Sequence, residues 1–236
     1  MYTGVQKSPK AETDMKPIKL ITALGFAALI AGCATTDTAS RNAPFANPAP
    51  AAQNLVDTNA YEVVTPALNI RKVNVIVPET LVVSEANSYY PSGDIVWRGD
   101  PAGDRHAQVK SIFETAMARG TADMDDGEPV ILDVQVFRFH ALTEKTRYTI
   151  GGVHSIKFGV TLRDARTGAL IGERRVVKAD LRGFGGQQAI DAERQGQTQK
   201  VRITDHLATV IKTELAQEGG YIGQRLGLVQ AINDTF

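Results

Sequence analysis

The sequence has a single cysteine, no excess of either charge and no apolar run long enough to cross a bilayer. One cysteine in 236 residues excludes an intrachain disulfide and a zinc site built from cysteines. Lys+Arg and Asp+Glu both number 26, which argues against the strong basic field of many nucleic-acid-binding proteins. Hydrophobic residues at 43% and charged residues at 22% are ordinary globular usage, so we expect one domain with appendages.

Catalytic motifs are also missing. No serine lies in a GxSxG pattern and no Walker A pattern occurs. None of the four histidines is spaced as HxxxH or HxH. His140 and His154 flank a turn and could approach across a hairpin, which supports only a third-ranked hypothesis of a periplasmic hydrolase. We interpret both as partly exposed strand residues, and predict a non-enzymatic protein with no catalytic residues, no metal and no bound cofactor.

The N-terminal segment predicts secretion. Basic residues in Met15–Lys19 precede an apolar run of 11 residues, Leu20–Ile30. A membrane-spanning helix needs about 20 residues, whereas a short basic region followed by an apolar run of this length is typical of a secretory signal peptide. We interpret Met15 as the initiator, so residues 1–32 comprise an upstream extension and the signal peptide.

The end of this segment, Leu29, Ile30, Ala31 and Gly32 followed by Cys33, resembles the lipobox of bacterial lipoproteins. The resemblance implies cleavage before Cys33 and covalent lipid on its thiol; the alternative is an ordinary signal peptide with a chance cysteine. Two or three acyl chains give stable membrane anchoring. Ala34 follows Cys33 where an inner-membrane lipoprotein would carry Asp. By resemblance to the enterobacterial sorting rule, this favours the outer membrane, facing the periplasm, over the inner membrane.

The mature chain divides into a linker, a domain and a tail. Residues 33–67 hold the cysteine and a stretch rich in Ala, Pro and Thr, too poor in apolar residues to fold alone. As a flexible coil this linker has an end-to-end distance of roughly 30 Å. We expect the periplasmic domain over residues 68–218 and a C-terminal tail over residues 219–236.

Hydrophobic periodicity predicts an α+β domain, with a mixed or antiparallel sheet of about four strands and two helices packed on one face. Helices are predicted at Asp104–Arg119 and Thr198–Gln217. The Arg71–Ser84 segment is either one strand with a bulge at Pro78 or two short strands. The other expected segments are strands Val130–Leu142, Val153–Leu162 and Ala169–Ala179, a hairpin at Asp164–Gly168, a loop at Asn87–Pro101 and a mobile loop at Gly183–Gln197.

In the Val130–Leu142 strand, simple alternation places Arg138 and His140 on the face of Val134 and Val136, with Phe139 on the opposite face. Two glycine clusters, Gly151-Gly152 and Gly183-Phe184-Gly185-Gly186, lack the GxGxxG spacing of a phosphate cradle.

Two groups of residues are candidates for a binding patch. Tyr89, Tyr90 and Trp97 lie in the Asn87–Pro101 loop and form either an exposed patch or a lid folded back on the core. Basic residues gather on one strand and its exit. They indicate a surface for anionic lipid, cell-wall polymer or an acidic partner, or, as we favour, an edge strand protected by charge. These basic residues are Arg174, Arg175, Lys178 and Arg182.

The lipobox, the linker and a small α+β domain with the Leu162–Leu170 hairpin resemble uncharacterised envelope lipoproteins of alphaproteobacteria. More distantly the layout is similar to auxiliary lipoproteins of ABC-type lipid or solvent transport systems and to tethered activators of peptidoglycan synthases. The resemblance implies a membrane-anchored binding module with an envelope protein or a lipid as partner, and no nucleic acid. The alternative is an assembly factor for a secretion or surface-appendage machine.

Overall fold

The computed structural model describes residues 67–227 and residue 230. The predictions made for the signal peptide, the lipobox and the linker up to residue 66 lie outside the described residues. The described elements in chain order are β1 (Leu68–Ile76), β2 (Ile95–Val96), α1 (Arg105–Gly120), β3 (Glu128–His140), α2 (Glu144–Arg147), β4 (Gly152–Asp164), β5 (Leu170–Lys178), β6 (Leu181–Gly183), α3 (Gly186–Arg194) and α4 (Gln199–Ala216).

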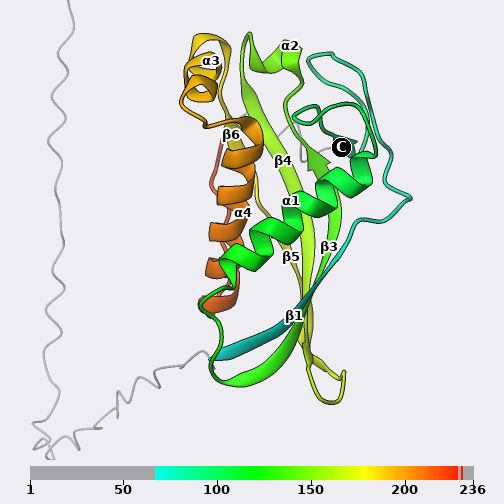
Figure 1. Ribbon diagram of the computed structural model, residues 1–236, viewed down its shortest axis with the longest axis vertical. Coiled ribbons are helices and arrows are strands. Elements are labelled where there is room, and N and C mark those ends of the chain that lie inside the picture. The colour runs from blue at the N-terminus through cyan, green and yellow to red at the C-terminus, as the bar shows by residue number, and fades with distance from the viewer. Residues whose placement is uncertain (1–66, 228–229, 231–236) are drawn as a thin grey trace, which may run out of the picture. The chain divides into compact units, whose positions relative to one another are not determined.

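The strands form a mixed sheet in the order β1-β3-β4-β5 (Figure 1). β1 pairs with β3 in parallel, with α1 in the connection between them. β3, β4 and β5 then run antiparallel to one another. The two-residue β2 pairs with the end of β3, and β6 pairs with the beginning of β4. The predicted α+β class, with four main strands and packed helices, is confirmed.

Helices α1 and α4 lie against each other on one face of the sheet (Figure 1). Both begin at a capping side chain: Asp104 accepts from the Ala107 amide at 3.0 Å, and Thr198 accepts from the Val201 amide at 3.3 Å. A Cβ at Gly120 would lie 2.4 Å from the Ala208 carbonyl oxygen, so this glycine permits the close approach of the two helices. No helix among the described residues is long and apolar enough to cross a membrane.

The core between helices and sheet centres on four aromatic rings. Trp97 and Phe139 pack edge to face with centroids 5.6 Å apart, and Phe139 meets Phe113 at 6.1 Å. Phe113 in turn meets Phe158 at 5.4 Å. These edge-to-face contacts add to the free energy gained by burying each ring. Trp97 therefore fixes part of the Asn87–Pro101 loop to the core.

A β-bulge in β3 corrects one prediction. The register shifts between Val136 and Arg138, where the strand carries an extra residue relative to β4. An inserted residue exchanges the two faces of everything that follows. Phe139 therefore lies in the core, and Arg138 and His140 do not share the face of Val136. The assignment of faces by simple alternation was wrong beyond the bulge.

Two segments differ from their predicted form. The Arg71–Ser84 segment is strand only up to Ile76, and Pro78 lies outside the strand, with Val83 making a single bridge to Ile95. The prediction of a mobile loop over Gly183–Gln197 was wrong, because most of this segment is α3. A long-range ion pair between α3 and the α2 region fastens it.

Candidate functional site

A cleft opens at the end of the domain where β3 and β6 finish, near α2 and the beginning of α3. Its volume is about 660 Å³, within the range of ordinary small-molecule sites. Four stretches that lie far apart in the sequence line it: residues 89–91, residues within 140–153, residues within 182–188, and residues 225–227 of the tail.

The loop that carries Tyr89 and Tyr90 is fastened to α2 by specific hydrogen bonds. The Thr143 hydroxyl donates to the Ser88 carbonyl at 2.8 Å, and the Lys145 amide donates to the Asn87 side chain at 2.9 Å. The Lys145 ammonium also lies 4.7 Å from the centroid of the Tyr89 ring, a cation–π distance. These contacts hold the two tyrosines at one wall of the cleft.

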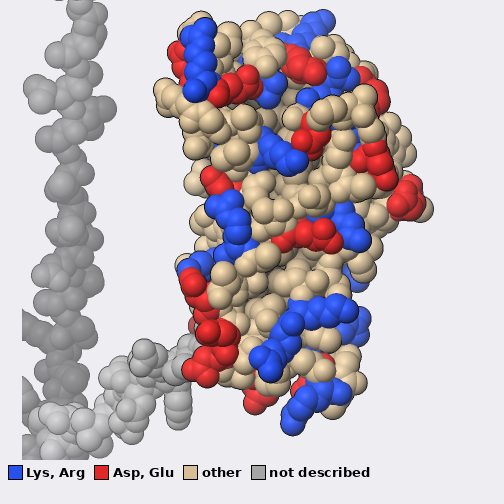
Figure 2. All heavy atoms as spheres, viewed as in Figure 1, with Lys and Arg blue, Asp and Glu red and all other residues tan. Residues whose placement is uncertain are grey.

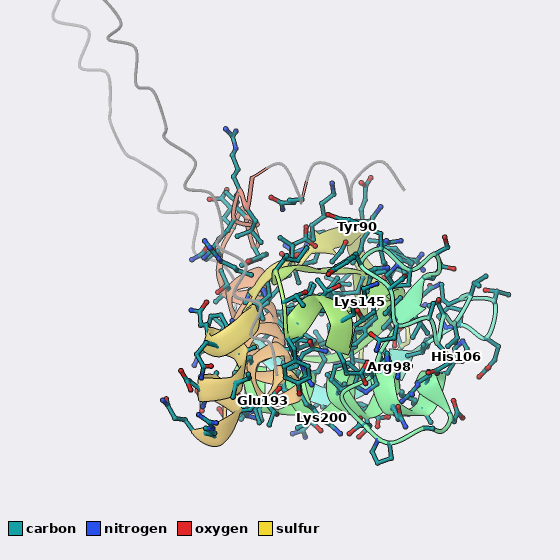
Figure 3. The ribbon with its side chains drawn as sticks, turned by 90° about the horizontal axis from the view of Figure 1, so that it is seen from above. Tyr90, Arg98, His106, Lys145, Glu193 and Lys200 are labelled. Atoms are coloured by element: carbon teal, nitrogen blue, oxygen red, sulfur yellow. The ribbon has the colours of Figure 1, made fainter. Side chains whose placement is uncertain are left out.

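An ion-pair network that includes residues of α1 and α2 also stabilises this loop. The buried Arg105 guanidinium donates to both Glu85 oxygens, at 2.6 and 3.0 Å. This hydrogen bonding, helped by the two nearby positive charges, lowers the pKa of Glu85. Arg98 pairs with Glu144 of α2 and donates to the Glu85 carbonyl at 2.8 Å. Seen from above, Lys145 lies between Tyr90 and Arg98 (Figure 3).

Glycines build the opposite wall. Gly151, Gly152, Gly183 and Gly185 all line the cleft. A Cβ at Gly185 would lie 2.3 Å from the Gly151 nitrogen, and Gly151 itself has a positive φ of 69°. The glycines are therefore required for the close contact of two backbones. Both clusters noted in the sequence are thus brought together, and their spacing does not form a GxGxxG phosphate cradle.

The described lining of the cleft is positively charged. Arg182 and Arg225 line it, and neither pairs with a carboxylate among the described residues, while none of the lining residues is acidic. The acidic side chains of α2 and α3 are all paired, Glu144 with Arg98, Glu193 with Arg147 and Asp191 with Arg194. By contrast, the face that α1 and α4 cover has charges of both signs interspersed (Figure 2). An anion would be favoured in this cleft.

The two histidines near the cleft have structural contacts. His140 lines the cleft, and its Nε2 lies 2.9 Å from the Pro91 carbonyl oxygen; burial lowers its pKa. His154 is buried, and its Nδ1 accepts from the Leu142 amide at 3.2 Å. Burial, with Arg202 and Arg147 adding to the effect, lowers the pKa of His154 to about 3. The expectation of a partly exposed His154 was wrong, and neither ring hydrogen-bonds a carboxylate in the described part of the chain.

The three aromatic residues predicted to form one patch, Tyr89, Tyr90 and Trp97, lie in two different places in the structure. Tyr89 and Tyr90 line the cleft, and Tyr90 is 62% exposed. Trp97 is fully buried, and its Nε1 donates to Asp100 at 2.8 Å. For Trp97, the alternative of a side chain folded back on the core therefore holds.

The predicted basic group is also divided. Only Arg182 reaches the cleft. Arg174 and Lys178 lie exposed on the edge strand β5, and Arg175 forms an ion pair with Glu214 of α4 at 2.8 Å. Sequence reasoning missed Ile150 and Arg225 as lining residues. Neither belongs to a periodic segment, so no pattern in the sequence indicated them.

Comparison with known proteins identifies a family and distant structural neighbours. A Xanthomonas campestris protein of the DUF330 family is 10% identical, with coverage of 73% of this chain and 91% of that one and a TM-score of 0.40. A Caulobacter crescentus protein described as a "putative lipoprotein" is 15% identical, with coverage of 61% and 87% and a TM-score of 0.28. Among curated proteins none matches the sequence. A family model does match residues 68–231, nearly the whole predicted domain and tail, and the chain therefore belongs to DUF6778, a family of unknown function.

Proposed function

We propose that the chain is a non-enzymatic lipoprotein of the cell envelope, anchored by lipid on Cys33 at the outer membrane, whose domain binds an envelope component in the cleft. The observation that carries the binding role is the cleft itself, with a volume of about 660 Å³. In the part of the chain that the structure describes, its lining has two arginines without an ion-pair partner and no acidic side chain. A concave site of this volume, with apolar side chains and a few convergent polar groups, is the usual form of a small-molecule site.

The length of the linker supports the combination of anchor and cleft. Ala67, where the described domain begins, is 34 residues beyond Cys33, a span of at most about 120 Å when fully extended. The domain begins at the start of β1, beside the start of β3, whereas the cleft lies at the far end of β3. The 13 residues of β3 correspond to about 40 Å. The linker is therefore long enough for the cleft to work either beside the anchoring membrane or away from it.

The anchor is tested by metabolic labelling with an alkyne analogue of palmitate. We expect label on the wild-type chain and none on Cys33→Ser, because no other thiol is present in the sequence. Fractionation of inner and outer membranes then assigns the compartment. A wild-type chain that takes up no label would contradict the anchor.

The binding role is tested by photocrosslinking in living cells. A photoreactive residue at Tyr90, on the rim of the cleft, should capture an envelope component. The matched control is Val176, which is 54% exposed on β5 and outside the cleft. Capture at position 90 and not at 176 is the expected result. The same products at both positions, or none at position 90, would overturn the role of the cleft.

A further inference from the structure

We propose that the ligand of the cleft is an anionic amphiphile: a lipid whose phosphate group contacts Arg182 and Arg225 and whose apolar part lies along Tyr90 and Ile150. This inference rests on the proposed function and names the class of its ligand. It follows from three properties of the cleft, which are its charge, the exposed apolar side chains at its mouth, and the fixed positions of the elements that carry them.

The charge favours a phosphate. Guanidinium groups bind phosphate oxygens through paired hydrogen bonds that are stronger than those between neutral groups. Arg182 is the central residue of β6, where its carbonyl oxygen accepts from Arg202 at 2.8 Å, and Arg225 approaches the same cleft from the tail. Among the described residues, no carboxylate lines the cleft to compete for these two cations. The nearby ammonium of Lys145, above the Tyr89 ring, adds positive charge on the opposite wall.

The mouth of the cleft favours an apolar group beside that phosphate. Ile150 is 67% exposed and Tyr90 is 62% exposed, and both line the cleft together with the partly buried Leu226. Large apolar side chains held in water at the rim of a site are typical of a surface that a ligand covers. Tyrosine combines an apolar ring with a polar hydroxyl, which suits the boundary between acyl chains and headgroups.

Contacts within the chain hold the walls of the cleft in place. The Tyr89–Tyr90 loop is tied to α2 by the hydrogen bond from Thr143 to Ser88, and the opposite wall is set by the contact between Gly151 and Gly185. A preformed site avoids the entropic cost of ordering loops around the ligand. The cleft can therefore bind a small headgroup without large rearrangement.

Calorimetry with short-chain lipids tests this proposal. The full-length chain, as the cell produces it, is placed in phosphatidylcholine nanodiscs and titrated with dihexanoyl phosphatidylglycerol. We expect binding at least tenfold tighter than that of dihexanoyl phosphatidylcholine, whose headgroup has no net charge. The double variant Arg182→Glu/Arg225→Glu should weaken binding at least tenfold. The control Arg166→Glu/Arg174→Glu has the same change of charge at exposed sites outside the cleft and should change it less than twofold.

A second arm separates a lipid from a free phosphate compound. Glycerol 3-phosphate has the charged group without acyl chains, and we expect it to bind at least tenfold more weakly than the lipid. Ile150→Ser should weaken the binding of the lipid and leave the binding of glycerol 3-phosphate unchanged. Equal binding of the two compounds would overturn the lipid assignment in favour of a free phosphate ligand. Equal effects of the two double variants would overturn the arginine contacts.

The outcomes also separate this inference from the proposed function. If neither phosphate compound binds but position 90 still captures a protein segment in cells, the cleft is a binding site and the lipid assignment is wrong. If position 90 captures nothing and no lipid binds, both fail. Thermal unfolding of each variant, compared with wild type, establishes that lost binding is not lost folding.

Discussion

The helix-covered body of the sheet and the cleft end are stabilised in different ways. In the body, Phe113 and Phe158 are fully buried in a continuous apolar core under α1 and α4. At the cleft end, ion pairs such as Arg147–Glu193 and backbone contacts such as Gly151–Gly185 hold separate segments together. The free energy gained by burying apolar side chains is proportional to the area removed from water. A partly exposed ion pair contributes little free energy, but it fixes the relative position of the two segments that it joins. The body therefore supplies stability, and the cleft end supplies shape.

The largest expected effect is in the body. Phe113→Ala removes a buried ring that packs edge to face on both Phe139 and Phe158. We expect the free energy of unfolding to fall by about 3–5 kcal/mol, because the lost burial is accompanied by a cavity. Urea unfolding measures it. Tyr90→Ala, at the rim of the cleft, is the control and should stay within about 0.5 kcal/mol of wild type. A comparable loss in both variants would break the distinction between body and cleft.

The sequence predicted the body well because its signals are local. Asp104 and Thr198, the first residues of the two predicted helices, are the N-caps of the helices that begin at Arg105 and Gln199. Gly168, with φ of 74°, ends the predicted hairpin turn. Apolar periodicity follows from one face of each element being buried, and it is visible without knowledge of the partner.

The bulge in β3, helix α3 and the cleft could not be predicted from the sequence, because they depend on contacts between segments that are distant in the chain. The bulge before Arg138 depends on the register with β4, which alternation within β3 does not encode. Helix α3 has one buried apolar side chain, Ala189, and is fastened through Glu193 to Arg147. The cleft combines Tyr90 with Arg225, which are brought together only by the folded chain. The aromatic loop and the cluster of basic residues marked Tyr90 and Arg182 as candidates, but neither pattern gave a reason to join them.

An intermediate effect is expected at the glycine wall. Gly185→Ala places a Cβ 2.3 Å from the Gly151 nitrogen and 2.5 Å from the Ile150 carbonyl carbon, both of them backbone atoms. The walls must separate, and we expect a loss of about 1–3 kcal/mol in unfolding free energy, together with lost binding in the cleft. Gly219→Ala is the matched control, because apart from its two neighbours in the chain no atom of the described residues lies within 4 Å of its Cβ position. Normal binding by Gly185→Ala would show that the cleft does not depend on this contact.

The third effect is the smallest near neutral pH and grows only when the pH is lowered. His154 is buried with its pKa lowered to about 3 from an ordinary value of 6.5. Between these values the unfolded chain holds a proton at this ring that the folded chain does not, so the fold loses stability as the pH falls. Each pH unit below 6.5 corresponds to about 1.4 kcal/mol, which gives a loss of about 2 kcal/mol at pH 5.

His154→Asn isolates this contribution. The Asn side-chain oxygen can still accept from the Leu142 amide, as Nδ1 does at 3.2 Å, but it takes up no proton in this range. Between pH 7 and pH 5 the variant should therefore lose about 2 kcal/mol less unfolding free energy than wild type. Because His140 and His206, whose pKa values are also lowered by burial, are unchanged in both proteins, their contributions cancel in this difference. Identical pH slopes in urea unfolding would mean that His154 takes up its proton in the folded state, and that the boundary between the body and the cleft is more open to water than its burial indicates.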